Sequence, residues 1–286
     1  MRYFLLFLSI CFLGLTGCFS NPIVGNKEPI EAAQYCAEQY PAPEFVEDAH
    51  LYTTLSITEI AKYDDLRKIT ISYYSQYPDI DLDYEAVSVS FKYLLVPWEW
   101  RWRNDITGSL HSLHGGTRNK IDQRRKNIKN SLSTTLKDPQ LDWLTGLIIH
   151  AYGDSFSHTK NEFNSEEEKA YNVWIGHAIP SIFGNSPDDI KQKGNEPKYL
   201  GYIDNLYDTL KTNDENYNEY AKFRDFVDNM ECNKGKCSDF HALFTNNPEN
   251  GRRIVQFTDC MNNEARPLLE TEVQQAMDLI SGNGID

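Results

Sequence analysis

The stretch from Leu147 to His158 constrains the fold of this chain more than any other part of the sequence. It reads Leu-Ile-Ile-His-Ala-Tyr-Gly-Asp-Ser-Phe-Ser-His, so His150, Asp154 and His158 follow one another at four-residue intervals. On an α-helix a step of four residues turns the side chain by only about 40°, so the three polar groups form one column. Trp143 and Leu147 fall on the same half of that helix. The column is therefore expected to face the protein interior.

Two imidazoles and a carboxylate on a buried face need partners, because an unpaired charge there is costly. A divalent metal ion is one such partner, and neighbouring hydroxyl groups that hold core histidines are the other. The remaining histidines favour the metal, because most of them also fall in ligand-like positions. The chain has seven histidines: His50, His111, His114, His150, His158, His177 and His241.

The N-terminus has the pattern of a bacterial export signal. An arginine at position 2 precedes an apolar run over residues 4–15, which is too short for an ordinary membrane span. Leu15-Thr-Gly-Cys18 resembles the lipobox of bacterial lipoproteins, in which the cysteine is lipidated and becomes the first residue. Phe19 rather than Asp follows it, which favours the outer membrane. We expect a signal peptide over 1–17, a lipidated tether over 18–28 and a single helical metal-binding domain over 29–286.

Composition limits the partners of that domain. Apolar residues make up 40% of the chain, which is enough to build a sizeable core. The formal net charge is -14, so long-range attraction to nucleic acid or to anionic lipid is disfavoured. An anionic substrate would need local cations, which bound Zn²⁺ could supply.

The cysteines predict disulfides. Setting aside Cys11 in the signal and Cys18 at the lipid site leaves an even number of cysteines for an oxidising compartment. Cys232 and Cys237 enclose a turn-like Asn-Lys-Gly-Lys and could close a short bridge, which would leave Cys36 to pair with Cys260. A zinc site made of all four is the alternative, although only one close pair is present.

Apolar residues recur at three- and four-residue intervals along most of the mature chain, and prolines mark the breaks. No strand-like alternation is long enough to build a sheet. Pro78 is expected to end a helix and to leave Asp79 at its exposed end. Gly115 and Gly116 give their segment a loop-like character, and 161–169 is mainly loop. The expected helices are 29–40, 45–62, 64–77, 84–95, 119–136, 140–158, 166–178, 198–212, 215–230 and 263–281.

The ordered set of polar residues carries a resemblance. The order His50, Asp79, His111 or His114, His150-x3-Asp154-x3-His158 and His177 resembles the ligand order of bacterial zinc-dependent phospholipase C, which the single-strand-specific nucleases of plants and fungi share. Tyr74-Ser-Gln-Tyr-Pro-Asp79, the central stretch, and Gly176-His177-Ala followed by Pro187-Asp188 are similar to an uncharacterised bacterial lipoprotein family related to those enzymes. The resemblance covers about residues 45–190, and its specificity lies in the ordered set.

The resemblance implies an all-α multi-helix bundle of the zinc-dependent phospholipase C type with two or three Zn²⁺. Asp79, one of His111 and His114, His150 and Asp154 would hold one ion, His158 and His177 a second, and His50 with a bridging Asp154 a third.

Two departures from the family pattern matter. The family uses its mature N-terminal residue as a ligand, whereas Cys18 lies well before His50, so Asp48 is a substitute candidate. Ser181 stands where the family has an acidic ligand, and Asp188 or Asp189 is the replacement candidate.

These residues suit phosphoester hydrolysis. Zn²⁺ accepts imidazole and carboxylate ligands together and lowers the pKa of bound water, whereas Mg²⁺ is disfavoured by so many imidazoles. Asp79 is the candidate for orienting the water or accepting its proton, and Asp154 is the second catalytic candidate. His241 is expected to be structural.

We therefore expect a lipid-anchored zinc phosphodiesterase that acts on phospholipid and has no favoured nucleic acid partner. The alternatives are a nuclease with the same metals, and a non-catalytic lipoprotein that keeps zinc for stability and binds a partner.

Overall fold

The computed structural model describes residues 23–40, 49–92, 100–172, 194–213, 215–229 and 248–282. Helices account for 72% of these residues, and one small sheet is present among them. The expected helical class is therefore confirmed for the described part of the chain. No helix in these ranges combines the length and the apolar character needed to cross a membrane.

Among the described residues, most helices fall within predicted ranges, but the helix Trp100–Asp105 and nearly all of the helix Pro248–Glu264 were not predicted. The α-helices are α2 (Pro29–Gln39), α3 (Ala49–Ile60), α4 (Asp65–Ile80), α5 (Ala86–Lys92), α6 (Trp100–Asp105), α7 (Arg118–Thr135), α8 (Asp142–Ser157), α10 (Glu196–Leu210), α11 (Tyr217–Asn229), α13 (Pro248–Glu264) and α14 (Glu270–Ser281).

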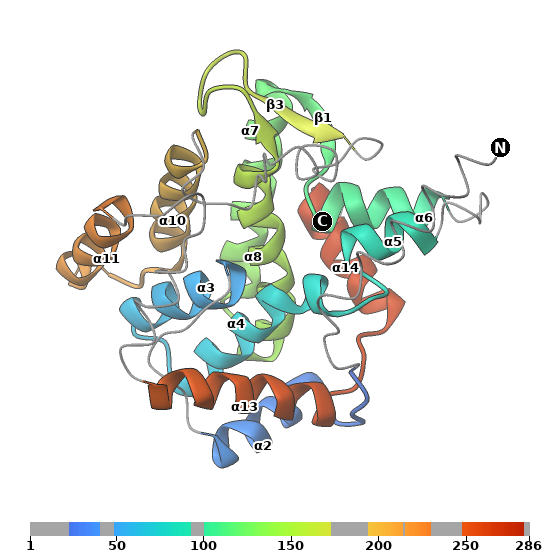
Figure 1. Cartoon of the computed structure of the whole chain (residues 1–286), viewed down its shortest axis with the longest axis vertical. Coiled ribbons are helices and arrows are strands. Elements are labelled where there is room, and N and C mark those ends of the chain that lie inside the picture. The colour runs from blue at the N-terminus through green and yellow to red at the C-terminus, as the bar shows by residue number, and fades with distance from the viewer. Residues whose placement is uncertain are drawn as a thin grey trace, which may run out of the picture.

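Helix α8 lies at the centre of the fold, with α10 on one side and α14 on the other (Figure 1). It also packs against α4, α7 and α3. Every residue from Asp142 to Phe156 is buried, as expected of a helix that is covered on all sides. The prediction that the polar column faces the interior is confirmed, because His150, Asp154 and His158 are only 0%, 3% and 2% exposed.

Helices α4 and α8 approach each other unusually closely. A Cβ atom at Gly146 would lie 2.6 Å from the carbonyl oxygen of Ile71, a distance that real Cβ atoms do not reach. Near the start of both helices, Arg67 donates from Nε and Nη2 to the buried carboxylate of Asp142, at 2.9 and 2.8 Å. Because Gly146 has no side chain and Arg67 pairs with Asp142, the two helices pack closely. Backbone groups of α4 can therefore contact side chains of α8.

A three-stranded antiparallel sheet caps one end of α7 and α8, which the sequence did not predict. Its order is β1 (His114–Thr117), β3 (Lys169–Asn172), β2 (Thr159–Lys160). The prediction of no sheet and the predicted helix over 166–178 are therefore wrong, the latter for the residues through 172 that the structure describes. Strands of two to four residues are too short to show a period-two pattern.

Positive backbone angles explain why the start of this sheet looked like a loop. Gly115 and Gly116 have φ of 62° and 110°, which side chains with a Cβ rarely adopt. The chain can therefore bend within β1 while Thr117 still pairs with Lys169.

The expected helix over 263–281 is interrupted in the structure, and only its first two residues belong to α13. Helix α13 ends at Glu264 and α14 begins at Glu270. Pro267 accounts for the break, because a proline disfavours the helical conformation of the residue before it and lacks the N–H that a helix needs. The periodic pattern resumed so soon after the proline that it concealed the break.

Two local features near the polar column also differ from expectation. Pro78 does not end its helix, because α4 continues to Ile80, although Asp79 does lie in the last turn as predicted. A π-helix over Ile106–Leu110 follows α6 directly. Its wider turn precedes His111, and such turns often occur at functional sites.

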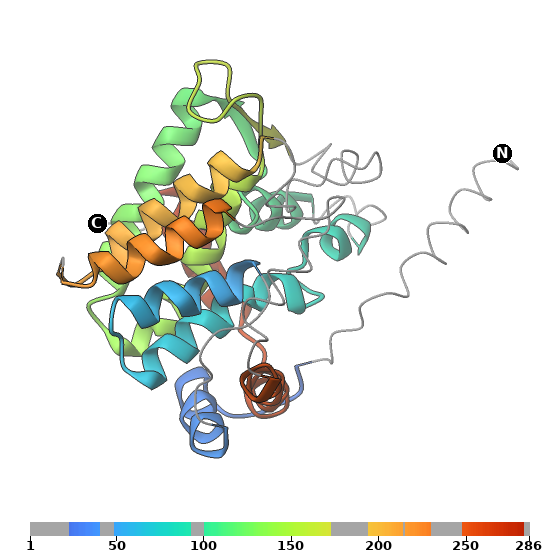
Figure 2. The same ribbon diagram turned by 60° about the vertical axis from the view of Figure 1, so that its left-hand side comes forward.

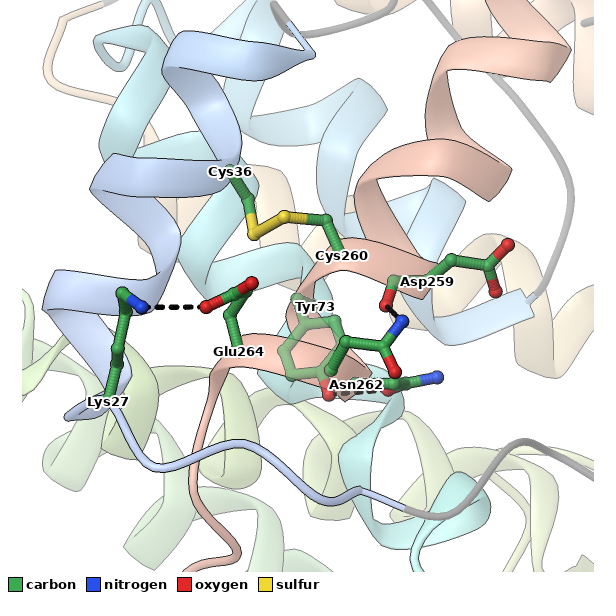
Figure 3. Close-up of a disulfide and its surroundings, with 8 residues drawn as sticks. Lys27, Cys36, Tyr73, Asp259, Cys260, Asn262 and Glu264 are labelled. Carbon is green, nitrogen blue, oxygen red and sulfur yellow. Dashed lines mark hydrogen bonds and ion pairs between the residues drawn. A yellow bond between two sulfur atoms is a disulfide. The ribbon is translucent and has the colours of Figure 1, made fainter.

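A disulfide joins the first described helix, α2, to α13 (Figure 3). Cys36 of α2 and Cys260 of α13 form a disulfide, as the cysteine count predicted, and α2 lies beside α13 in both ribbon views (Figure 2). The backbone N–H of Val24 donates to Asn262 O at 2.9 Å, and Lys27 pairs with Glu264 at 2.7 Å. Part of the segment expected to be a tether is therefore attached to the domain.

Candidate metal centre

Four segments of the chain bring polar side chains to the middle of α8. Helix α8 itself contributes His150 and Asp154. Helix α3 contributes His50, the last turn of α4 contributes Asp79, and the residue after the π-helix is His111. Two overlapping groups form here, His50 with His150 and Asp154, and Asp79 with His111 and His150, each with ligand atoms within 4.8 Å of one another.

Backbone carbonyl groups fix which nitrogen of each imidazole is protonated. His150 Nδ1 lies 2.9 Å from Ser75 O, and His111 Nε2 lies 2.8 Å from Tyr84 O. A carbonyl oxygen only accepts hydrogen bonds, so both ring nitrogens must donate. In the neutral imidazoles, Nε2 of His150 and Nδ1 of His111 therefore carry lone pairs.

These two lone pairs converge on the carboxylate of Asp154. His150 Nε2 and His111 Nδ1 lie 3.3 Å apart, and each lies 3.3 Å from Asp154 Oδ2. That oxygen is buried, and with both nitrogens unprotonated no hydrogen bond to it is formed within the part of the chain that the structure describes. Three electron-rich atoms at this spacing repel one another unless a cation lies between them. Ligands about 2.0–2.1 Å from a tetrahedral zinc ion are separated by about 3.3 Å, so the triangle fits zinc.

Asp79 lies on the open side of this triangle. Its Oδ1 is 3.9 Å from His111 Nδ1 and 3.8 Å from His150 Nε2, further than Asp154 is. Its side chain is 37% exposed, whereas those of His111 and His150 are at most 2% exposed. Gln76 donates from Nε2 to Asp79 Oδ2 at 3.1 Å and so holds the carboxylate in place. Of the residues in the two groups, Asp79 is therefore the most exposed to solvent.

The second oxygen of Asp154 faces a different histidine. Asp154 Oδ1 lies 3.1 Å from His50 Nε2, while Oδ2 faces His111 and His150. The carboxylate is therefore oriented between two sets of imidazoles, which is the arrangement expected of a bridging or firmly oriented ligand.

His158 approaches the same carboxylate through its protonated nitrogen. Its Nδ1 donates to His111 O at 2.6 Å and lies 3.6 Å from Asp154 Oδ2. Nδ1 is therefore not available to bind a metal, and Nε2 is the atom that could act as a ligand. The contact also ties the end of α8 to the backbone of His111.

His114 lies outside both groups. It is in β1, where Nδ1 donates to Gly115 O at 2.7 Å. Burial, and then the nearby Arg124, lower the pKa of His114 to about 4. Of the two histidines that the sequence left as alternatives, the structure thus brings His111 to the centre.

The charge states of His150 and Asp154 favour cation binding, whereas a proton on Nδ1 of His111 would have to leave before that nitrogen could bind a metal. Burial lowers the pKa of His150, which keeps its imidazole neutral. Burial opposes ionisation of Asp154, yet the surrounding His158 and His150 hold its pKa well below the usual range. Burial also opposes protonation of His111, but Asp154 raises its pKa. An ionised carboxylate among imidazoles is the donor set that zinc prefers.

Several predicted residues lie outside the described part of the chain. This applies to the second-ion ligand His177, to the substitute ligands and to the lipid site. It applies equally to the second cysteine pair and to the histidine expected to be structural. The residues are Cys18, Asp48, His177, Ser181, Asp188, Asp189, Cys232, Cys237 and His241.

Sequence reasoning missed the residues that position the ligands. Ser75 and Tyr84 act through backbone carbonyls, for which no sequence signal exists. Gln76 could have been found, because it lies three residues before Asp79 on the same helical face.

Comparison with known proteins returned no relative. No protein-family model, curated protein or solved structure matches this chain.

Proposed function

We propose that this chain is a zinc-dependent phosphodiester hydrolase that a lipid at Cys18 holds in the bacterial envelope. The observation that carries the proposal is the triangle of His111 Nδ1, His150 Nε2 and Asp154 Oδ2, whose edges are all 3.3 Å. With both rings neutral, no described residue donates a hydrogen bond to that oxygen. The ligand order that resembles zinc-dependent phospholipase C supports the choice of reaction. Two or three zinc ions remain the expectation.

Buried residues would bind the metal, and an exposed residue would act on the attacking water. When bound, zinc supplies Lewis acidity and makes water a nucleophile near neutral pH. His111, His150 and Asp154 would hold the ion. Asp79, on the open side, would orient the attacking water and accept its proton, because it is close to both imidazoles and yet exposed to solvent.

The alternative, a closed structural zinc site, has one observation in its favour, which is that Asp79 could serve as a fourth ligand. Structural zinc sites are closed by four protein ligands, whereas catalytic sites keep a position open. The longer separations of Asp79, 3.8 and 3.9 Å, and its exposure favour an open position. A phospholipid is the favoured substrate over nucleic acid, because the proposed lipid at Cys18 would keep the chain beside a membrane and the net charge of -14 repels a nucleic acid polyanion.

Elemental analysis combined with a hydrolysis assay tests the proposal. The purified full chain, expressed with ample zinc, should contain two or three equivalents of zinc and hydrolyse a soluble phosphodiester. Asp154→Asn should lose most of both, because one carboxylate contacts all the imidazoles of the centre. His114→Ala is the matched control and should keep its zinc. A zinc-free parent chain would end the proposal, and zinc without hydrolysis would favour the structural alternative.

The anchor has a separate test. Replacing Cys18 by Ala removes the proposed lipid site and should move the chain from the membrane fraction to the soluble fraction. The chain should stay folded, because contacts that attach this segment to the domain, such as the hydrogen bond from Val24 N to Asn262 O, lie beyond Cys18. A variant that stays with membranes despite signal removal would show that another feature holds it there.

A further inference from the structure

Gly153 precedes Asp154 on α8 and faces the imidazole of His50. A Cβ atom at Gly153 would lie 2.9 Å from His50 Cε1 and 3.1 Å from His50 Nδ1, and 3.2 Å from Tyr202 Cζ. The first distance is shorter than real Cβ contacts. The ring of His50 therefore occupies space that any other residue at position 153 would fill.

The ring has little freedom to move away. Its Nε2 is 3.1 Å from Asp154 Oδ1, and its centroid is 4.1 Å from that of His150 at an interplanar angle of 37°. The side chain is 15% exposed. A displacement of a few tenths of an ångström away from α8 would lengthen the contact with Asp154 directly.

We propose that Gly153 is a positioning residue that seats His50 against Oδ1 of Asp154 and thereby aims Oδ2 at the metal. In this role His50 orients the carboxylate rather than holding an ion, so the chain would hold two zinc ions rather than three. The inference rests on the proposed function for its metal, but the contact itself exists without one. Groups that orient a ligand in this way typically change metal affinity about 10–100-fold when they are altered.

A double-mutant cycle on the full chain tests this role, with zinc affinity measured by competition against a chromophoric chelator. Gly153→Ala should weaken zinc binding about 10–100-fold, and His50→Ala should weaken it to a similar degree. In the His50→Ala background the ring is gone, so adding Gly153→Ala should change the affinity less than about twofold, because the two sites are coupled.

Gly146→Ala is the matched control, because both glycines lie on α8 and both lack space for a Cβ. A Cβ at Gly146 meets backbone, the carbonyl oxygen of Ile71 at 2.6 Å, rather than the His50 ring. Its cost to thermal unfolding of the metal-free chain should be the same with His50 present or replaced. The cost of Gly153→Ala should instead fall when His50 is replaced by Ala.

Each outcome decides the proposal. If Gly153→Ala does not fold, the double variant should fold, and its failure to do so would overturn the role of His50. Equal effects of Gly153→Ala in both backgrounds would assign the clash to Tyr202 and refute the proposal. Loss of one whole zinc equivalent with the remaining affinity unchanged would make His50 a ligand instead. If the parent binds no zinc, the proposed function fails, and the thermal cycle still tests the contact.

Discussion

At the scale of single residues, backbone carbonyls orient three imidazoles of the candidate centre. Each of His111, His150 and His158 donates one ring N–H to a carbonyl from a different segment, at 2.8, 2.9 and 2.6 Å. Each ring is thus fixed in one tautomer and one orientation before any metal binds. The side chains therefore lose their conformational freedom during folding, and less would be lost if a metal bound.

Gln76 provides a residue-scale prediction. It is 7% exposed and donates to Asp79 at 3.1 Å. Gln76→Leu keeps the volume but removes the donor, so Asp79 loses its orientation while the buried triangle is unchanged. We expect kcat for a soluble phosphodiester to fall about 10–100-fold with an unchanged zinc content. Gln123→Leu, which removes an exposed Gln that donates to Asn127, should leave kcat at the parental value. A parental kcat in Gln76→Leu would contradict this role.

At the scale of elements, a buried ion cluster attaches the small sheet to the end of α8. Glu168 is fully buried and accepts from Arg125 Nη2 at 2.9 Å, from Arg118 Nη1 at 3.2 Å and from Asn164 N at 2.9 Å. Arg125 also donates to Ser155 O, near the C-terminus of α8, where a cation complements the helix dipole. The cluster thus fixes the helical turn between Asp154 and His158.

Removing the charge of Glu168 should reveal this attachment. Glu168→Gln leaves Arg125 buried without its counter-ion, which typically costs about 3–5 kcal/mol of unfolding free energy. Urea unfolding of the metal-free chain measures the loss. The exposed neighbour Glu167 gives the control, because Glu167→Gln should change stability by less than about 0.5 kcal/mol. A loss below about 1 kcal/mol in Glu168→Gln would mean that solvent compensates Arg125.

Some elements of the fold could be predicted from the sequence, and others could not. Helices such as α2, α7 and α8 were predictable, because a long apolar period survives small errors at either end. The β1–β3–β2 sheet was not, because its strands are held by partners distant in sequence, such as His114 opposite Asn172. The side-chain order located His50, Asp79 and Asp154, whereas the choice between the two loop histidines depended on tertiary packing.

At the scale of the whole molecule, a disulfide links helices that are far apart in the sequence. Cys36 and Cys260 are 224 residues apart in the sequence, and the disulfide joins α2 to α13 (Figure 3). Helix α13 in turn contacts α4 through Asn262 Oδ1, which accepts from Tyr73 OH at 2.7 Å. The disulfide therefore connects α2 and α13 near α4, and neither cysteine is a proposed ligand.

The last prediction follows from this separation. Replacing Cys36 and Cys260 together by Ala should lower the free energy of unfolding by about 2–5 kcal/mol, because a cross-link across so long a loop restricts the unfolded chain. Zinc content should stay at the parental value, since the triangle of His111, His150 and Asp154 depends on α4, α8 and the π-helix. Urea unfolding in excess chelator isolates the effect of the disulfide from that of the metal. Loss of zinc along with stability would show instead that the disulfide between Cys36 and Cys260 also stabilises the metal centre.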